Sequence, residues 1–170
     1  MLKRWLPLTL IVAGLGLLIV SAAIWRLSAS PGHVSPALLP AALAGLPLRS
    51  WTDGPQAIAE IGRMHTEGFP LKSAAIGRYG TSDQVMLWVS EMANAAAARQ
   101  MAEAMSRSIA EVSSPFRETG QQSRVASLIH ELEGMGQKHF FYPSGLHVVW
   151  LGADPAFAEQ ALRNTLEMYP

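Results

Sequence analysis

The strongest hydrophobic pattern lies near the N-terminus, where residues 5–25 read WLPLTLIVAGLGLLIVSAAIW and contain no charged side chain. A helix of this length spans about 30 Å, which matches the hydrocarbon thickness of a bilayer. Trp5 and Trp25 would then lie at the two membrane interfaces as anchors. Residues 1–26 are therefore predicted to form a short cytoplasmic start and a transmembrane signal-anchor helix.

A cleaved signal peptide is the alternative, because the basic start MLKR precedes the apolar run. The hydrophobic region of a signal peptide usually spans only about 7–15 residues. The small-residue site at residues 28–30 is followed by Pro31, which we expect to hinder cleavage. Two basic residues before the span against one after it predict a cytoplasmic N-terminus. The rest of the chain would then be periplasmic, anchored in a bacterial inner membrane by a single pass.

After the apolar run, prolines interrupt any regular spacing of apolar residues. Residues 27–45 contain Pro31, Pro36 and Pro40, which are incompatible with a continuous helix and predict a semi-extended linker. In residues 46–170, apolar residues again recur at strand or helix spacing over short segments. We expect these residues to form one periplasmic α+β domain.

Within that domain, two periodicities alternate along the chain. Alternating apolar positions between turn residues predict strands, at residues 46–51, 70–79, 84–91, 123–134, 138–142 and 146–152. Helical spacing predicts helices, at residues 52–65, at residues 97–112 and after Asp154. The middle helix has the clearest pattern, because apolar residues keep to one face while charges of alternating sign repeat every four residues on another.

Two stretches of the domain share one plan. In each, a tyrosine ends a strand at a glycine-containing turn, a tryptophan lies on the returning strand, and an amphipathic helix follows. The matching residues are Tyr79 with Trp88 and Tyr142 with Trp150. Two such β-β-α units predict an antiparallel sheet with helices on one face, related to ferredoxin-like α+β folds.

The stretch GMGQKHFFYPSGLHVVW, residues 134–150, is predicted to form a β-hairpin rich in rings. With residues 143–145 as a three-residue loop, Tyr142 would pair with Leu146. The row that contains Tyr142 and Trp150 is apolar throughout, as the core beneath a helix requires. The aromatic residues are thus expected to serve packing.

The histidines of this hairpin leave two interpretations open. In the same register, His139 and His147 would share the other face of the hairpin. Their imidazoles could converge on zinc or copper, with Glu131 or Glu133 on the neighbouring strand as oxygen ligands. The spacing lacks the compactness of a metal motif such as His-Glu-x-x-His, so the same face is better suited to a partner or a small ligand than to a metal.

Met64 and His65 raise the question of haem, because both residue types are axial haem ligands. The chain has no cysteine, which excludes covalent attachment through Cys-x-x-Cys-His. Both residues also complete the apolar stripe of the first helix of the domain. Gln137 and Lys138, just before the hairpin histidines, would present polar groups at the rim of a ligand or partner face.

The net charge of the predicted periplasmic part of the chain excludes some functions. Removing Lys3, Arg4 and Arg26 from 13 basic residues leaves 10 basic against 13 acidic residues, a net charge of −3. Such a domain has no basic footprint for nucleic acid and no polybasic patch for anionic lipid. No serine has the Gly-x-Ser-x-Gly setting of a nucleophile, so an enzyme has no support from individual residues.

The segments EIGRMHTEGFPL, QVMLWVSE and GMGQKHFFYPSGLHVVWL resemble those of uncharacterised bacterial envelope proteins. These proteins have an N-terminal membrane segment and a small α+β domain. The resemblance covers about residues 47–150 and implies no known activity. It points to His65 and to residues 137–139 as positions of interest.

The sequence thus predicts a membrane-anchored periplasmic interaction module, or an accessory or assembly factor, without intrinsic catalysis. Its expected partners are the membrane and a protein of the envelope, and no cofactor is predicted. The alternative is a small-ligand, metal or haem-binding envelope protein that uses His65, His139 and His147.

Overall fold

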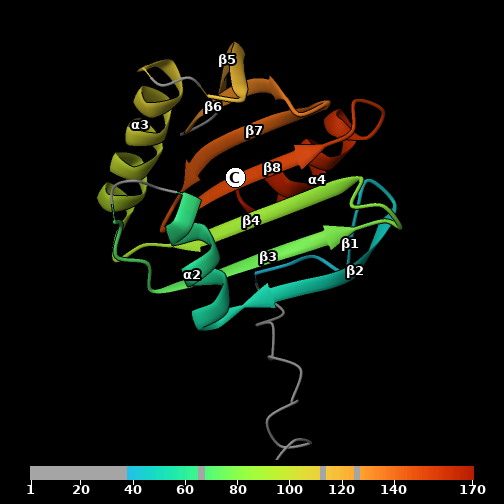
Figure 1. The fold of residues 1–170 in the computed structure, drawn as a ribbon, viewed down its shortest axis with the longest axis horizontal. Helices are drawn as coiled ribbons and strands as arrows, with labels where there is room; N and C mark the ends of the chain where they lie inside the picture. Colours follow the sequence, from blue (N-terminus) through green and yellow to red (C-terminus); the bar gives the residue numbers. More distant parts are fainter. Residues whose placement is uncertain (1–37, 65–67, 112–113, 125–126) are drawn as a thin grey trace, which may run out of the picture. The chain divides into compact units, whose positions relative to one another are not determined.

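The structure, a computed structural model, describes residues 38–64, 68–111, 114–124 and 127–170 (Figure 1). The predicted transmembrane helix, with Trp5 and Trp25, lies outside the described residues, as does His65. Among the residues that are described, no helix is both long and apolar enough to cross a membrane.

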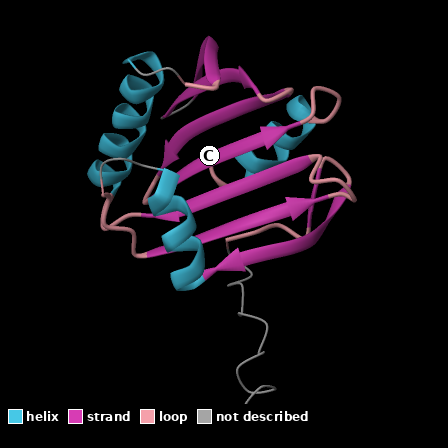
Figure 2. Ribbon diagram, viewed as in Figure 1, coloured by secondary structure: helices cyan, strands magenta, loops and turns pink. Residues whose placement is uncertain are grey.

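Eight antiparallel strands form one sheet in the order β1-β2-β3-β4-β8-β7-β6-β5. The strands are β1 (Ala42–Leu43), β2 (Leu46–Asp53), β3 (Ser73–Tyr79), β4 (Val85–Glu91), β5 (Phe116–Arg124), β6 (Ser127–Gly134), β7 (Gln137–Ser144) and β8 (His147–Ala153). The described helices are α2 (Gly54–Met64), α3 (Ala95–Glu111) and α4 (Ala158–Met168). The sheet curls into an open half-barrel (Figure 2).

The helices lie on both faces of this sheet. Because side chains alternate along a strand, each central strand sends apolar residues to both faces. Helix α4 packs against one row, which we call the α4 face; it includes Leu87, Val89, Phe140, Tyr142, Val149 and Leu151. Helices α2 and α3 pack against the other, the α2–α3 face; it includes Ala74, Ile76, Leu132, Phe141 and Val148.

This arrangement corrects the predicted fold class. The α+β content is confirmed, but the ferredoxin-like relationship and the placement of all helices on one face are wrong. The two hairpins that resemble each other in sequence, β3-β4 and β7-β8, are followed by helices on opposite faces. Local periodicity predicts a helix after each hairpin, yet it carries no information about which face that helix will cover.

The first described residues belong to the core of the α4 face. Leu39 and Leu43 are 5% and 0% exposed, and the Tyr169 hydroxyl donates to the Leu38 carbonyl at 2.7 Å. Strand β1 pairs with the start of β2. These residues precede Leu46, where the sequence pattern places the start of the domain, and they include Pro40, which suggested a linker although Leu39 beside it is already in the core.

The register of the β7-β8 hairpin differs from the predicted one. Tyr142 pairs with Val149 and Ser144 with His147, so the loop is the two-residue turn Gly145-Leu146. The predicted pairing of Tyr142 with Leu146 is therefore wrong by an odd number of residues. An odd shift moves one strand's side chains to the other face relative to its partner.

The polar segment before β6 is also a strand. The sequence pattern predicts one strand over residues 123–134, whereas the structure has β5 and β6 as an antiparallel pair. Strand β5 reads FRETGQQSR and forms the edge of the sheet, where it remains largely exposed. An edge strand packs few apolar side chains, which explains why alternation of apolar residues did not reveal it.

The predicted middle helix is confirmed as α3. Its apolar stripe is buried, with Ala98, Met101 and Met105 between 0% and 7% exposed. Arg99, Glu103 and Arg107 of its charged stripe are exposed. The Asn94 side-chain oxygen accepts the Ala97 N–H at 2.9 Å and caps the first turn.

The turn between β6 and β7 carries backbone strain. Met135 has φ 54° and Gly136 has φ 80°, and they connect the paired residues Gly134 and Gln137. Two consecutive positive φ angles are typical of the type I′ hairpin turn, which favours Asn-Gly. Met135 is also 79% exposed, so its side chain gains little from packing.

We therefore expect Met135→Asn to raise the free energy of unfolding by about 0.5–1 kcal/mol, because asparagine adopts left-handed backbone more readily than methionine. Urea unfolding measures this difference. Leu146→Asn is the control, since Leu146 is an exposed turn residue without a positive φ. An equal gain in both variants would mean that lost apolar exposure, and not backbone conformation, is responsible.

Candidate functional site

A ladder of rings crosses three neighbouring strands on the α2–α3 face. The His130 ring stacks on Phe141 with centroids 4.4 Å apart, and Phe141 stacks on Trp150 at 5.3 Å. The interplanar angles are 3° and 10°, so the three rings are nearly parallel. Strand register explains this, because His130, Phe141 and Trp150 face one another across β6, β7 and β8.

His139 is fixed beside this ladder by both of its ring nitrogens. The Trp150 indole N–H donates to Nδ1 at 3.2 Å, and Nε2 lies 3.2 Å from the Gly134 carbonyl oxygen. A nitrogen that accepts from an indole must be unprotonated, whereas one that faces a carbonyl must carry hydrogen. His139 is therefore a neutral imidazole with hydrogen on Nε2. Burial lowers its pKa, although the bond to Gly134 acts in the other direction.

Gly152 makes room for this imidazole. It lies opposite His139 on β8, and a Cβ atom there would approach Nδ1 to 2.9 Å and Cε1 to 3.0 Å. The His139 ring thus lies against the backbone of the neighbouring strand. Phe116 from the edge strand closes the other side, with ring centroids 4.8 Å apart.

His130 forms the polar end of the ladder. Its Nδ1 lies 3.0 Å from Glu118 Oε1, and the Gln121 amide donates to the same carboxylate oxygen at 2.8 Å. Burial acts to raise the pKa of Glu118, but the hydrogen bonds from Gln121 and His130 and the charge of His130 outweigh it and lower the pKa. This group joins β5 to β6 through side chains.

The structure does not bring the two predicted histidine ligands together. His139 lies on the α2–α3 face, whereas His147 lies on the α4 face, where its ring meets Tyr169 at 5.3 Å. The prediction that they share a face is wrong, because it depended on the three-residue loop. Within the described residues, no group of three His, Asp or Glu side chains is arranged to hold a metal ion; the third predicted ligand, His65, lies outside them.

The two predicted rim residues and the two predicted glutamate ligands, which the sequence also offers to a ligand or partner face, divide between the two faces in the same way. Gln137 lies on the α2–α3 side and donates to Asp154 Oδ1 at 3.0 Å. Glu131, Glu133 and Lys138 lie on the α4 side, with Glu133 directly opposite Lys138. Neither glutamate is therefore on the face of His139.

These charged groups already have partners in the fold. Glu133 pairs with Arg117 at 3.1 Å, and Lys138 lies 4.0 Å from Glu159. The Glu131 carboxylate accepts a hydrogen bond from the Gln122 amide. They are exposed or partly exposed ion pairs and hydrogen bonds, which contribute little to stability.

A different surface is suited to binding. Helix α2 packs over β2 and β3, and α3 packs over β5, β7 and β8, so the part of the face along β4 lies between them (Figure 1). Four large side chains there are only partly buried, and we call them the β4 seam: Arg78, Met86, Trp88 and Trp150. Trp88 and Trp150 face each other directly across β4 and β8.

Charged groups surround one end of the β4 seam. The Arg78 guanidinium lies 3.4 Å from Glu60 and 3.9 Å from Asp83, and its side chain is 27% exposed. Arg78 has the same phase along β3 as Ala74 and Ile76, which face α2. An arginine on the otherwise apolar face of a strand is the sequence signal for this surface, and it was missed.

The α4 face has an apolar depression and two unusual tyrosines. The depression is apolar and lies between β6 and α4, lined by Arg124, Ser127, Ile129, Leu166 and Pro170. Tyr79 and Tyr142 are fully buried, their hydroxyls have no hydrogen-bond partner, and burial raises the pKa of both. They stay protonated in the physiological range and add no acid–base group there.

No protein-family model, curated protein or solved structure matches this chain. The function is therefore inferred from the residues and their geometry alone.

The state of His139 predicts a dependence of stability on pH. Because the pKa is lowered in the folded state, the unfolded chain binds more protons as the pH falls below the ordinary histidine value of 6.5. We expect the free energy of unfolding to decrease between pH 7 and pH 5, and His139→Gln to weaken this decrease. His147→Gln, on the other face, should keep it. Urea titrations at both pH values measure the difference, and an unchanged slope in His139→Gln would contradict the assignment.

Gly152→Ala tests the packing of the same imidazole. The added methyl group would displace the ring and break the bond from Trp150, so we expect a loss of about 1–3 kcal/mol in the free energy of unfolding. Gly62→Ala is the matched control, because a Cβ at this helical position meets nothing within 4 Å. The free energy of unfolding of this control should rise by up to about 1 kcal/mol, because alanine has a higher helix propensity than glycine. Equal effects in the two variants would exclude a specific contact at Gly152.

Proposed function

We propose that this protein is a membrane-anchored periplasmic interaction module without intrinsic catalysis, which binds a partner protein of the envelope through the β4 seam. The location comes from the sequence pattern: an uncharged run over residues 5–25, a proline-containing linker and an α+β domain. The proposed contact surface comes from the fold. The two lines of support are independent of each other.

The observation that carries the proposal is the incomplete cover of Trp88 and Trp150. These are the largest side chain type, they lie on central strands, and two helices pack on the same face without enclosing them. In protein interfaces, tryptophan and arginine contribute most often to residues that dominate binding. The β4 seam combines two tryptophans and a methionine with one arginine at its end.

The surroundings of the β4 seam also resemble an interface. Glu60 and Asp83 beside Arg78, and Gln137 bonded to Asp154, supply polar groups at its margin. An apolar centre with a polar rim is the common anatomy of protein–protein contacts. Neighbouring ion pairs would also disfavour partners with the wrong charge pattern.

The alternative function, metal or haem binding through histidines, gains no support from His139. Both of its ring nitrogens are engaged, and a metal would have to replace the bond from Trp150. The ladder explains the position of His139 through packing and hydrogen bonding. We therefore favour a protein partner.

Site-specific photocrosslinking in intact membranes tests the proposal. A photoreactive amino acid at position 86 of the full-length chain should give one discrete adduct with a membrane or periplasmic protein. Adding Arg78→Glu should reduce that adduct about tenfold, since it replaces the cation with a like charge beside Glu60 and Asp83.

The same amino acid at position 146 is the control, because Leu146 is exposed in the β7-β8 turn, away from the β4 seam. Circular dichroism of each variant checks that the domain is folded. Adducts of equal yield at positions 86 and 146 would overturn the assignment of the binding surface. So would an adduct at position 86 whose yield is unchanged by Arg78→Glu.

A further inference from the structure

One edge of the sheet is only partly covered. Strand β1 pairs with Leu46 and Pro47 alone, and the Leu48 N–H donates to the Ala41 carbonyl at 2.9 Å. Beyond Leu48, none of the strands that the structure describes lies against the outer edge of β2. An open edge of this kind is a template for pairing with another strand.

The sequence along this edge is self-complementary. Residues 49–53 read Arg-Ser-Trp-Thr-Asp. If two copies of β2 pair antiparallel with a twofold axis at Trp51, Arg49 of each copy faces Asp53 of the other. The same register places Ser50 opposite Thr52 and Trp51 opposite its own copy.

We propose that two copies of this chain associate through β2 in that register, which joins their sheets across a twofold axis. All three kinds of cross-strand pair in this register are favourable ones: opposite charges, two hydroxyl residues and two aromatic rings. Moving the axis to Ser50 or Thr52 places one member of the charged pair opposite Trp51 and leaves the charges unmatched. The charge pattern therefore selects one register.

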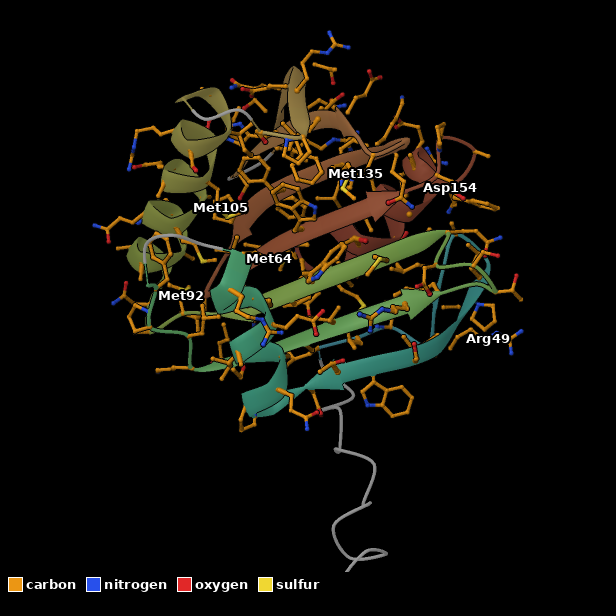
Figure 3. The ribbon with its side chains drawn as sticks, viewed as in Figure 1. Arg49, Met64, Met92, Met105, Met135 and Asp154 are labelled. Carbon is orange, nitrogen blue, oxygen red and sulfur yellow. The ribbon has the colours of Figure 1, made fainter. Side chains whose placement is uncertain are left out.

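The solvent exposure of residues along β2 agrees with this arrangement. Arg49 and Ser50 are exposed, and Trp51 is 41% exposed, which is unusual for tryptophan on a strand of a large sheet. Figure 3 shows the Arg49 side chain extending away from the sheet. No ion pair of Arg49 or Asp53 occurs among the described residues. Both charges are thus available to a second copy.

The opposite edge of the sheet is less suitable. Strand β5 has a register irregularity between Glu118 and Gly120 in its middle, which disrupts a regular edge. In β2 the irregularity lies at Arg49, between Leu48 and Ser50, so it falls at the end of the proposed pairing and residues 50–53 remain regular. Antiparallel pairing of β5 with itself about Gln121 would place Glu118 opposite Arg124, but the Glu118 carboxylate is already bonded to Gln121 and His130 within the fold.

The position of the linker favours a second copy of the chain over a soluble partner. The Leu39 side chain lies over Gly77, which faces Trp51 across β2 and β3. Leu39, near the start of the described residues, therefore lies close to this edge. If residues 5–25 anchor each copy in one membrane, the effective concentration of edges rises and a small contact suffices for association.

Cysteine crosslinking of the full-length chain in membranes tests the register directly, because the natural sequence has no cysteine. Copies with Ser50→Cys and copies with Thr52→Cys, expressed together, should form a disulfide-linked dimer on mild oxidation. Ser50→Cys alone should give about tenfold less dimer, since its two copies lie two residues out of register. A pair of Ser50→Cys and Gln121→Cys tests head-to-tail pairing of β2 with β5.

Charge exchange then tests the chemistry. In the crosslinking background, Arg49→Asp or Asp53→Arg alone should lower the dimer yield about tenfold, because each places like charges opposite each other twice. The double variant Arg49→Asp with Asp53→Arg should restore the yield. Unfolding midpoints of these variants check that the fold is unchanged.

The proposal is overturned by three results. The first is the absence of dimer from the Ser50 and Thr52 pair; the second is equal yield from Ser50→Cys alone or from the pair with Gln121→Cys. The third is a yield that does not recover in the double charge variant. Because β2 is separate from the β4 seam, none of these results affects the crosslinking test at position 86.

Discussion

The pairing of β4 with β8 is the interaction on which the rest of the fold depends. Each of these strands ends one run of antiparallel strands, β1 to β4 and β5 to β8, and seven residue pairs from Val85–Ala153 to Glu91–His147 join the two runs. The pairing places Val89 opposite Val149 toward α4 and Trp88 opposite Trp150 toward α2 and α3. Without it, α4 would lose the surface formed by β8, β7 and β1, and the part of the sheet under α2 would separate from the part under α3.

The helix positions follow from where the chain must go after each central strand. After β4, the chain must reach the far edge at β5, and α3 spans the sheet on the way, over β7 and β8. After β8, no strand remains, and α4 packs on the opposite face against β8, β7 and β1. Helix α2 belongs to the connection from β2 to β3 and therefore covers only the other half. The side chains of the β4 seam lie on the part of the α2–α3 face that neither connection covers fully.

The three described helices and the β3-β4 and β7-β8 hairpins could be predicted from the sequence, but the β5-β6 hairpin and the assignment of strand faces could not. Helix α3 has a long stripe of one period, which a single sequence reveals. Strand β7 instead has apolar side chains on both faces: Phe140 and Tyr142 on one and Phe141 on the other are all at most 1% exposed. A strand buried on both faces lacks the polar alternation that fixes register, so both loop lengths fit the sequence. The error in loop length then placed His139 and His147 on one face.

The histidines show how a residue type that suggests chemistry can be used for structure. His139 accepts from Trp150 and donates to Gly134, which connects β8, β7 and the β6-β7 turn through one side chain. His130 stacks on Phe141 while its nitrogen meets Glu118, which links the core to the edge strand. In both cases the imidazole has a ring to pack and polar atoms to satisfy, which neither phenylalanine nor asparagine provides together. These groups link β5, β6, β7 and β8 through side chains and hold Trp150 in place within the β4 seam. If a partner binds there as proposed, it meets a preformed surface with little ordering cost.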